Sequence, residues 1–138
     1  MGNYFGSDLN KFIAEYCEHK FTTINIDCLC LKWETKTLRI IEAKHSKEPL
    51  GLQQVKALSF LGARLSCLEF NGWTFEAYIT RGDYPYDILV IFDLIRGRYF
   101  KLTGQDNVIN WLSFKSNLLD ISEEVTLTQN SFYQRLSI

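Results

Sequence analysis

The sequence predicts an α/β or α+β domain, from its length and from two kinds of apolar periodicity. A chain of 138 residues, of which 46% are hydrophobic, suits one compact domain with its own core. Apolar residues recur at helical spacing near the start of the chain and again over residues 50–65. Stretches rich in β-branched and aromatic residues, typical of strands, lie between and after them. We therefore expect residues 1–138 to form a single domain.

Three helices are expected. The first, near the start of the chain, has an apolar side that includes Tyr16, and Glu15 lies at the edge of that side. The second covers residues 50–65 and carries Gln54 beside its apolar stripe. Asp106 is expected to cap the third. The stripe of the second helix comprises Val55, Leu58, Leu61 and Leu65, and the third helix holds Val108, Ile109, Trp111 and Leu112.

Polar breaks divide the strand-like stretches into hairpins. The break around Thr35 predicts a hairpin with its turn near that residue. Asn71-Gly72 is the strongest hairpin signal in the sequence, and Arg96-Gly97 marks another turn. The expected strands are residues 22–33, 38–43, 66–70, 73–80, 86–94 and 98–102.

Composition narrows the class of protein. The formal charge of −1 is not that of a basic protein that coats nucleic acid, so any contact with nucleic acid must come from local clusters. The start of the chain lacks the apolar core of a signal peptide, and the longest apolar run, residues 88–92, is too short to span a bilayer. We expect a cytoplasmic, intracellular protein with no membrane association.

The cysteines predict no zinc site. The four occur without a Cys-x-x-Cys pair, and the chain has only two histidines. Cys28 and Cys30 are two apart on an expected strand and so share one face. Reduced cysteines buried in the core are the simpler expectation.

The stretch IDCLCLKWETKTLRIIEAKH, residues 26–45, carries the candidate chemistry. Glu42 and Lys44 are two apart on a strand, so both side chains leave the same face. Asp27 lies on the partner strand and comes opposite Glu42 if the turn centres near Thr35. A slip of one residue in the register would send Asp27 to the other face.

Two carboxylates and a lysine at a strand end suit metal-assisted hydrolysis of phosphodiester bonds. Carboxylate oxygens hold Mg²⁺, which keeps several waters and binds substrate phosphate. The metal acts as a Lewis acid and lowers the pKa of a bound water, and an ammonium group stabilises charge on the phosphoryl oxygens. A Glu-x-Lys pair alone is a common surface ion pair. The apolar run that precedes Glu42 and the aspartate on the partner strand favour catalysis over a solvated face.

This segment resembles the PD-(D/E)xK nuclease superfamily, which includes restriction endonucleases, archaeal Holliday-junction resolvases and some homing endonucleases. In that family a helix with a glutamate precedes a hairpin that carries Asp and Glu-x-Lys, and a helix that often carries a glutamine follows. The resemblance covers residues 7–65. Ile26 replaces the proline of the motif, and eight residues between Glu18 and Asp27 leave little room for the family's first strand.

The resemblance implies a restriction-endonuclease-like mixed β-sheet flanked by helices. It also implies a Mg²⁺-dependent endodeoxyribonuclease, specific for a DNA site or structure, in which Mn²⁺ can substitute. By position, Asp27, Glu42 and Glu15 correspond to the metal ligands. Lys44 corresponds to the catalytic lysine and Gln54 to the glutamine of the following helix, although Gln54 is also explained as a helix-edge amide.

DNA and a second copy of the chain are the expected partners. Two groups of basic residues are candidates for contact with DNA phosphates. The residues that flank the expected site are Lys47, Lys56 and Arg64. The residues around the second turn, where simple solvation is an equally good explanation, are Arg96, Arg98 and Lys101. A homodimer or tetramer is expected, because one site cuts one strand. Aromatic residues offered for its interface are Trp73, Phe75, Tyr78, Tyr84, Tyr86, Phe92, Tyr99 and Phe100.

Two other functions remain open from the sequence. One is a catalytically silent nuclease-fold protein that binds nucleic acid or protein, in which Asp27 and Glu42 lie apart or pair with cations. The other is an α+β interaction domain in which Glu-x-Lys has no role, and Asp27 and Lys44 on opposite faces would favour it.

Overall fold

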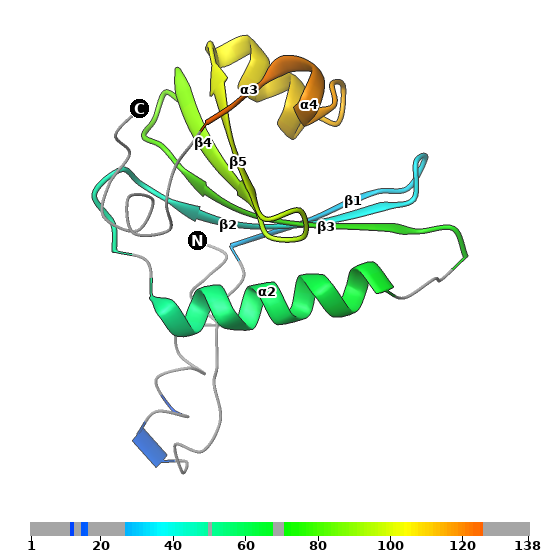
Figure 1. Ribbon diagram of the computed structural model, residues 1–138, viewed down its shortest axis with the longest axis vertical. Coiled ribbons are helices and arrows are strands. Elements are labelled where there is room, and N and C mark those ends of the chain that lie inside the picture. Colours follow the sequence, from blue (N-terminus) through cyan, green and yellow to red (C-terminus); the bar gives the residue numbers. More distant parts are fainter. Residues whose placement is uncertain (1–11, 13–14, 17–26, 50, 68–70, 126–138) are drawn as a thin grey trace.

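A computed structural model describes residues 12, 15–16, 27–49, 51–67 and 71–125. These residues build a six-stranded mixed sheet in the order β1-β2-β3-β4-β5-β6, with helices packed on it (Figure 1). The α+β class is therefore confirmed. The strands are β1 Cys28–Lys32, β2 Thr37–Lys44, β3 Thr74–Arg81, β4 Ile88–Asp93, β5 Arg98–Thr103 and β6 Glu123–Glu124, and the helices are α2 Leu52–Cys67, α3 Gln105–Leu112 and α4 Leu118–Ile121.

The first hairpin has the register that the sequence predicts. β1 pairs antiparallel with β2, from Cys28 opposite Ile41 to Lys32 opposite Thr37. The turn therefore centres between Glu34 and Thr35, as predicted, and Lys36 within it has a left-handed backbone (φ 52°). Extending the register by one residue sets Asp27 opposite Glu42.

β2 also pairs with β3, and this pairing is parallel. It runs from Thr37 beside Thr74 to Lys44 beside Arg81. Parallel neighbours require a crossover connection, and α2 supplies it by running along one face of the sheet (Figure 1). The crossover brings the ends of β2 and β3 to the same end of the sheet.

The hairpin predicted at Asn71-Gly72 is wrong. Ser66 and Cys67 are helical, so α2 continues into the predicted strand 66–70, whose last three residues lie outside the described part. Asn71 (φ 52°) and Gly72 (φ 76°) do have the left-handed backbone that such a turn needs. The turn lies between a helix and a strand instead, because α2 extends to Cys67 and β3 begins at Thr74.

Each face of the sheet buries its own core. The α2 side contains Ile40, Val55, Leu58, Ile79, Val90, Phe92 and Tyr99, with Leu61 and Leu65 packed against them. The apolar stripe predicted for α2 is thus confirmed. The other side contains Ile41, Tyr78, Leu89, Ile91, Phe100, Leu102, Val108, Trp111 and Leu118.

Several other element predictions need correction. The N-cap of α3 is Gly104, so Asp106 lies in the first turn, and only Val108 and Trp111 of its four predicted apolar residues are buried. The turn at Arg96-Gly97 is confirmed, whereas β4 begins at Ile88 rather than at residue 86.

The first helix and the cysteines also differ from expectation. The first helix lies mostly outside the described residues, and Tyr16 is exposed rather than buried. Cys28 and Cys67 are free but exposed, and Cys30 is half-buried, so the expectation of buried cysteines is wrong for the first two. Cys17 lies outside the described part. No helix in the described ranges is long and apolar enough to cross a membrane.

A buried arginine joins the sheet to α3 on the side away from α2. Arg39 donates from Nε to Glu76 Oε1 (2.8 Å) and from Nη1 to the Trp111 carbonyl (2.8 Å). Its guanidinium lies 4.0 Å from the centre of the Phe114 ring. The end of α3 is thereby attached to β2, so both faces of that strand are fixed.

A glycine allows α2 to approach β3 closely. A Cβ atom at Gly62 would lie 3.1 Å from the Ala77 Cβ and 3.4 Å from Ile95 Cγ1. Larger side chains there must push the helix away from the sheet. Ala63, the next residue on the same helix, is exposed.

Replacing Gly62 by leucine should lower the free energy of unfolding by ~1–3 kcal/mol, because the added atoms overfill the helix–sheet contact. Ala63→Leu is the matched control, and it should have little effect because alanine and leucine have similar helix propensities. Urea unfolding of the two variants measures the difference. Equal midpoints would contradict the close contact.

Candidate active site

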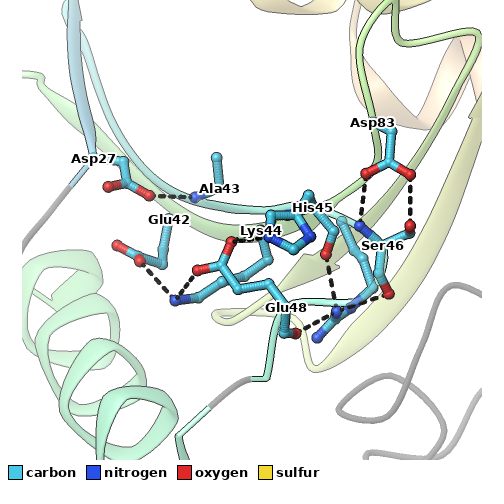
Figure 2. A network of polar contacts seen from close by, with 9 residues as sticks. Asp27, Glu42, Ala43, Lys44, His45, Ser46, Glu48 and Asp83 are labelled. Carbon is cyan, nitrogen blue, oxygen red and sulfur yellow. Dashed lines mark hydrogen bonds and ion pairs between the residues drawn. The ribbon is translucent and has the colours of Figure 1, made fainter. Parts of the chain in front are cut away.

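Asp27 and Glu42 face each other across the first hairpin, on the α2 side of the sheet. The Ala43 amide donates to Asp27 Oδ2 (3.0 Å), which holds the aspartate against β2 (Figure 2). Glu42 belongs to the same face as Ile40, which packs on α2. Its residue is only 3% exposed, whereas Asp27 is exposed.

Lys44 joins this pair from the same face of β2. Its Nζ lies 3.3 Å from Glu42 Oε2 and 3.1 Å from Glu48 Oε2. Figure 2 shows the ammonium between the two carboxylates, with Glu48 reaching back from the loop that follows the strand. The Lys44 ammonium is therefore held in place by a carboxylate on each side.

The carboxyls of this cluster have opposite pKa shifts. Burial, and then the negative charge of Asp27, raise the pKa of Glu42, while Lys44 and Gln54 oppose the rise. Burial also acts to raise the pKa of Glu48, but hydrogen bonds from the Lys44 ammonium and the His45 amide outweigh it and leave that pKa below its usual value. The site thus holds one carboxyl that resists ionisation beside one that favours it.

One oxygen of Glu42 is left unsatisfied. Oε1 is buried and has no hydrogen-bond partner among the described residues. A buried carboxylate oxygen without a partner costs free energy, and a cation shared with Asp27 would offset that cost. No group of three or more His, Cys, Asp or Glu side chains suited to a metal occurs in the described ranges. The two carboxylates nevertheless fit Mg²⁺, which is commonly held by one or two carboxylates, waters and substrate phosphate.

A buried arginine holds the loop between β2 and α2. Arg81, at the end of β3, donates from Nη1 to the carbonyls of His45 (3.1 Å), Ser46 (3.2 Å) and Glu48 (2.7 Å). Arg81 is fully buried. Because three carbonyls of one short loop share this donor, the loop has a fixed path, and the backbone of Glu48 is fixed with it.

The next loop along the chain fastens the same segment from its other side. Asp83 accepts hydrogen bonds from the Ser46 amide (2.8 Å) and from the Ser46 hydroxyl (Figure 2). These bonds lower the pKa of Asp83, with the hydroxyl as the larger cause. His45, one residue after Lys44, is exposed.

Sequence reasoning missed Glu48, Arg81 and Asp83. A charged residue that ends an apolar strand was the available signal for Arg81, since such a residue is buried only if it is paired. Glu48 follows Lys44 by four residues outside any strand or helix, so no local periodicity marks it. Asp83 is distant from the motif in sequence, and only the parallel pairing of β2 with β3 brings it close.

Of the two supporting residues predicted from the resemblance, one reaches the site. Gln54, in the first turn of α2, is half-buried and near enough to the Glu42 carboxyl to lower its pKa. Glu15 is exposed, and its short helical segment lies below α2 in Figure 1, away from β1 and β2. The structure thus brings together Asp27, Glu42, Lys44 and Gln54, and it does not bring Glu15 to them.

The basic residues fall into two sets. Lys47, Lys56 and Arg64 are exposed, the first on the loop held by Arg81 and the others on α2. The second set is paired with acids at 3.7–3.9 Å: Arg96 with Asp93, Arg98 with Glu124 and Lys101 with Glu123. The turn at Arg96 lies at the opposite end of the sheet from Lys44, because β4 runs antiparallel to β3. Arg64 also lies toward that end, because Gly62 on the same part of α2 packs against Ile95. Lys47 and Lys56 are therefore the better candidates for nucleic-acid contact near Lys44.

Comparison with known proteins identifies no relative. Neither a protein-family model, a curated protein nor a solved structure matches this chain. Function must therefore be inferred from the chemistry and geometry of the site itself.

In Asp27→Asn the pKa of Glu42 should fall, because the variant removes a neighbouring negative charge and leaves the burial unchanged. NMR titration of the side-chain carboxyls, without divalent metal, measures the shift. Glu48 is the internal control, since Asp27 is not among the causes of its shift. An unchanged Glu42 pKa would mean that the two carboxylates are not coupled.

Proposed function

We propose that this protein is a metal-dependent endonuclease that hydrolyses phosphodiester bonds in DNA. The observation that carries the proposal is the pairing of Asp27 with a buried Glu42, whose Oε1 has no partner among the described residues, beside the Lys44 ammonium. This arrangement supplies ligands for Mg²⁺ and a cation for the phosphate. Mn²⁺, which also takes oxygen ligands, is expected to substitute.

The fold supports membership of the PD-(D/E)xK nuclease superfamily. The hairpin carries Asp27 before β1 and Glu42-Ala43-Lys44 at the end of β2, and the helix that follows presents Gln54 to Glu42. This is the order expected of that family after its first helix. We therefore propose the restriction-endonuclease-like fold as the finer description of the mixed sheet. The exposed position of Glu15 is a departure from it.

Each residue has a role in the proposed reaction. Asp27 and Glu42 would hold the metal, which when bound supplies Lewis acidity and a water of lowered pKa. Lys44, positioned by Glu42 and Glu48, would orient the attacking water and stabilise charge that develops on the phosphoryl oxygens. Gln54 would position the Glu42 carboxylate. Arg81 acts through the loop backbone and so is a positioning residue.

A second function is favoured by one specific observation. Lys44 is paired with both Glu42 and Glu48, and such pairing is what a catalytically silent nuclease-fold protein would also have. That protein would bind nucleic acid or a protein partner without cutting. An interaction domain in which Glu-x-Lys has no role is less consistent with Asp27, Glu42 and Lys44 on one face.

Lys44→Ala should reduce cleavage by roughly 100-fold or more while folding and DNA binding persist, because the ammonium acts mainly in the transition state. Asp27→Asn should abolish cleavage and weaken Mg²⁺ binding. The substrates are supercoiled plasmid, branched DNA and RNA, each incubated with and without Mg²⁺, and melting temperature is measured alongside. Lys115→Ala, an exposed lysine after α3, is the matched control and should cut like wild type.

The outcomes separate the candidate functions. Mg²⁺-dependent cleavage that is lost in both variants supports the endonuclease. Nucleic-acid binding without cleavage by the wild-type protein favours the silent protein. Full activity in Lys44→Ala would remove the lysine from the mechanism.

We also propose that the protein acts as a homodimer or tetramer, because two sites are needed to cut both strands of a duplex. Half of the aromatic residues suggested for the interface are buried in the core instead, namely Tyr78, Phe92, Tyr99 and Phe100. Light scattering over a concentration series should give the mass of a dimer or larger species. A monomer at micromolar concentration that still makes double-strand breaks would contradict this proposal.

A further inference from the structure

Two tyrosines project from the loop between β3 and β4, residues 82–87. Tyr84 is 85% exposed and Tyr86 is 39% exposed. Their ring centres lie 6.2 Å apart with the planes at 80°, so the rings meet edge to face. Leaving two large rings in water forgoes the free energy of burying them, which makes the pair a candidate binding surface.

The loop that carries the tyrosines is firmly held. The Tyr86 amide donates to the Asp83 carbonyl (2.8 Å), which closes the turn. Gln105 Nε2 donates to the Pro85 carbonyl (2.8 Å), and the Gly104 amide donates to the Asp87 carbonyl (2.7 Å). Anchors at both ends and in the middle mean that the rings are presented by a fixed backbone. A preorganised surface of this kind loses little entropy when it binds.

The same loop is joined to the candidate active site. The Gly82 amide donates to the Lys44 carbonyl (3.0 Å), and Asp83 accepts from the Ser46 amide and hydroxyl. Lys47, the exposed lysine that follows Ser46, lowers the pKa of Asp83 together with His45 and so lies close to the loop. The tyrosines, the Lys47 ammonium and the Lys44 side chain therefore gather at one end of the sheet.

We propose that Tyr84 and Tyr86 form a stacking platform for an unpaired base of the nucleic-acid substrate, next to the scissile phosphate. This inference rests on the proposed endonuclease function and defines its substrate class. Bases stack on exposed aromatic rings regardless of sequence, and a nearby lysine attracts the adjoining phosphate. The hydrogen bond that joins the tyrosine loop to the end of β2 at Lys44 would place the phosphate beside an unpaired nucleotide.

The platform determines which substrates are favoured. In an intact duplex both faces of each internal base are already covered by neighbouring base pairs, so the rings have nothing to stack on. Single strands, flaps, branch points and frayed ends offer an uncovered base. We therefore expect the protein to prefer these structures to continuous duplex, for DNA and for RNA alike where the same base chemistry is present.

Binding measured without cleavage tests the platform. Fluorescence anisotropy with labelled single-stranded DNA, single-stranded RNA and duplex DNA, in the presence of a chelator, gives the affinity of the full chain for each. Wild type should bind the single strands more tightly than the duplex. Tyr84→Ala should weaken single-strand binding by roughly 5- to 100-fold and leave duplex binding unchanged, whereas Tyr84→Phe, which keeps the ring, should bind like wild type.

A control variant and a second, independent measurement guard against indirect effects. Trp33→Ala removes an equally conspicuous aromatic, 72% exposed, from the hairpin turn at the far end of β2, and should not change binding. In a second measurement, iodouracil in a single-stranded oligonucleotide is irradiated in the complex, and peptide mapping should find the crosslink at Tyr84 or Tyr86. This readout uses the wild-type chain and so does not depend on the folding of a variant.

The results test the stacking-platform proposal and the endonuclease proposal separately. If single-strand binding depends on Tyr84 but no Mg²⁺-dependent cleavage is found, the stacking platform is supported and the endonuclease proposal is contradicted. Cleavage by wild type together with unchanged single-strand binding in Tyr84→Ala, or a crosslink elsewhere, overturns the platform alone. An altered oligomeric state of Tyr84→Ala with unaltered strand affinity would also overturn it, because the rings would then contact a second copy of the chain.

Discussion

The parallel pairing of β2 with β3 is the constraint on which the site depends. It runs without interruption from Thr37 beside Thr74 to Lys44 beside Arg81. Because the two strands point the same way, α2 must cross the sheet to connect them, and it brings Gln54 under Glu42. The same pairing sets the loops after both strands at one end of the sheet, where Arg81 and Asp83 bind the loop that follows Lys44.

Buried charge in this fold is arranged differently in the sheet and at the site. Arg39 is matched by a carboxylate, a carbonyl and aromatic rings, so its burial attaches β2 to α3 at little cost. Glu42 is as deeply buried but has one oxygen without a partner among the described residues, and burial raises its pKa. Incomplete satisfaction of a buried charge is uncommon in a structural role, and it is typical of sites where a ligand completes the set.

Two loops at this end of the sheet carry the residues to which we assign catalysis and base recognition in the proposed function. Residues 45–49 carry Glu48, which orients Lys44, and residues 82–87 carry the two tyrosines. Asp83 joins one loop to the other through Ser46. Hydrogen bonds from the Ser46 amide to Asp83 and from the Gly82 amide to the Lys44 carbonyl therefore connect the tyrosine loop to the segment that carries the lysine.

The sequence by itself determined the α+β class, the hairpin centred near Thr35, the apolar stripe of α2 and the grouping of Asp27, Glu42 and Lys44. These features depend on periodicity and on pairing between residues close in the chain, which local patterns encode. Tertiary structure decided the rest. Asn71-Gly72 adopts the backbone of a hairpin turn, but residues 66 and 67, which a hairpin would place on the partner strand, belong to α2. Arg81 and Asp83 come close to the site only through pairing between strands far apart in sequence, and no local pattern records which strands become neighbours.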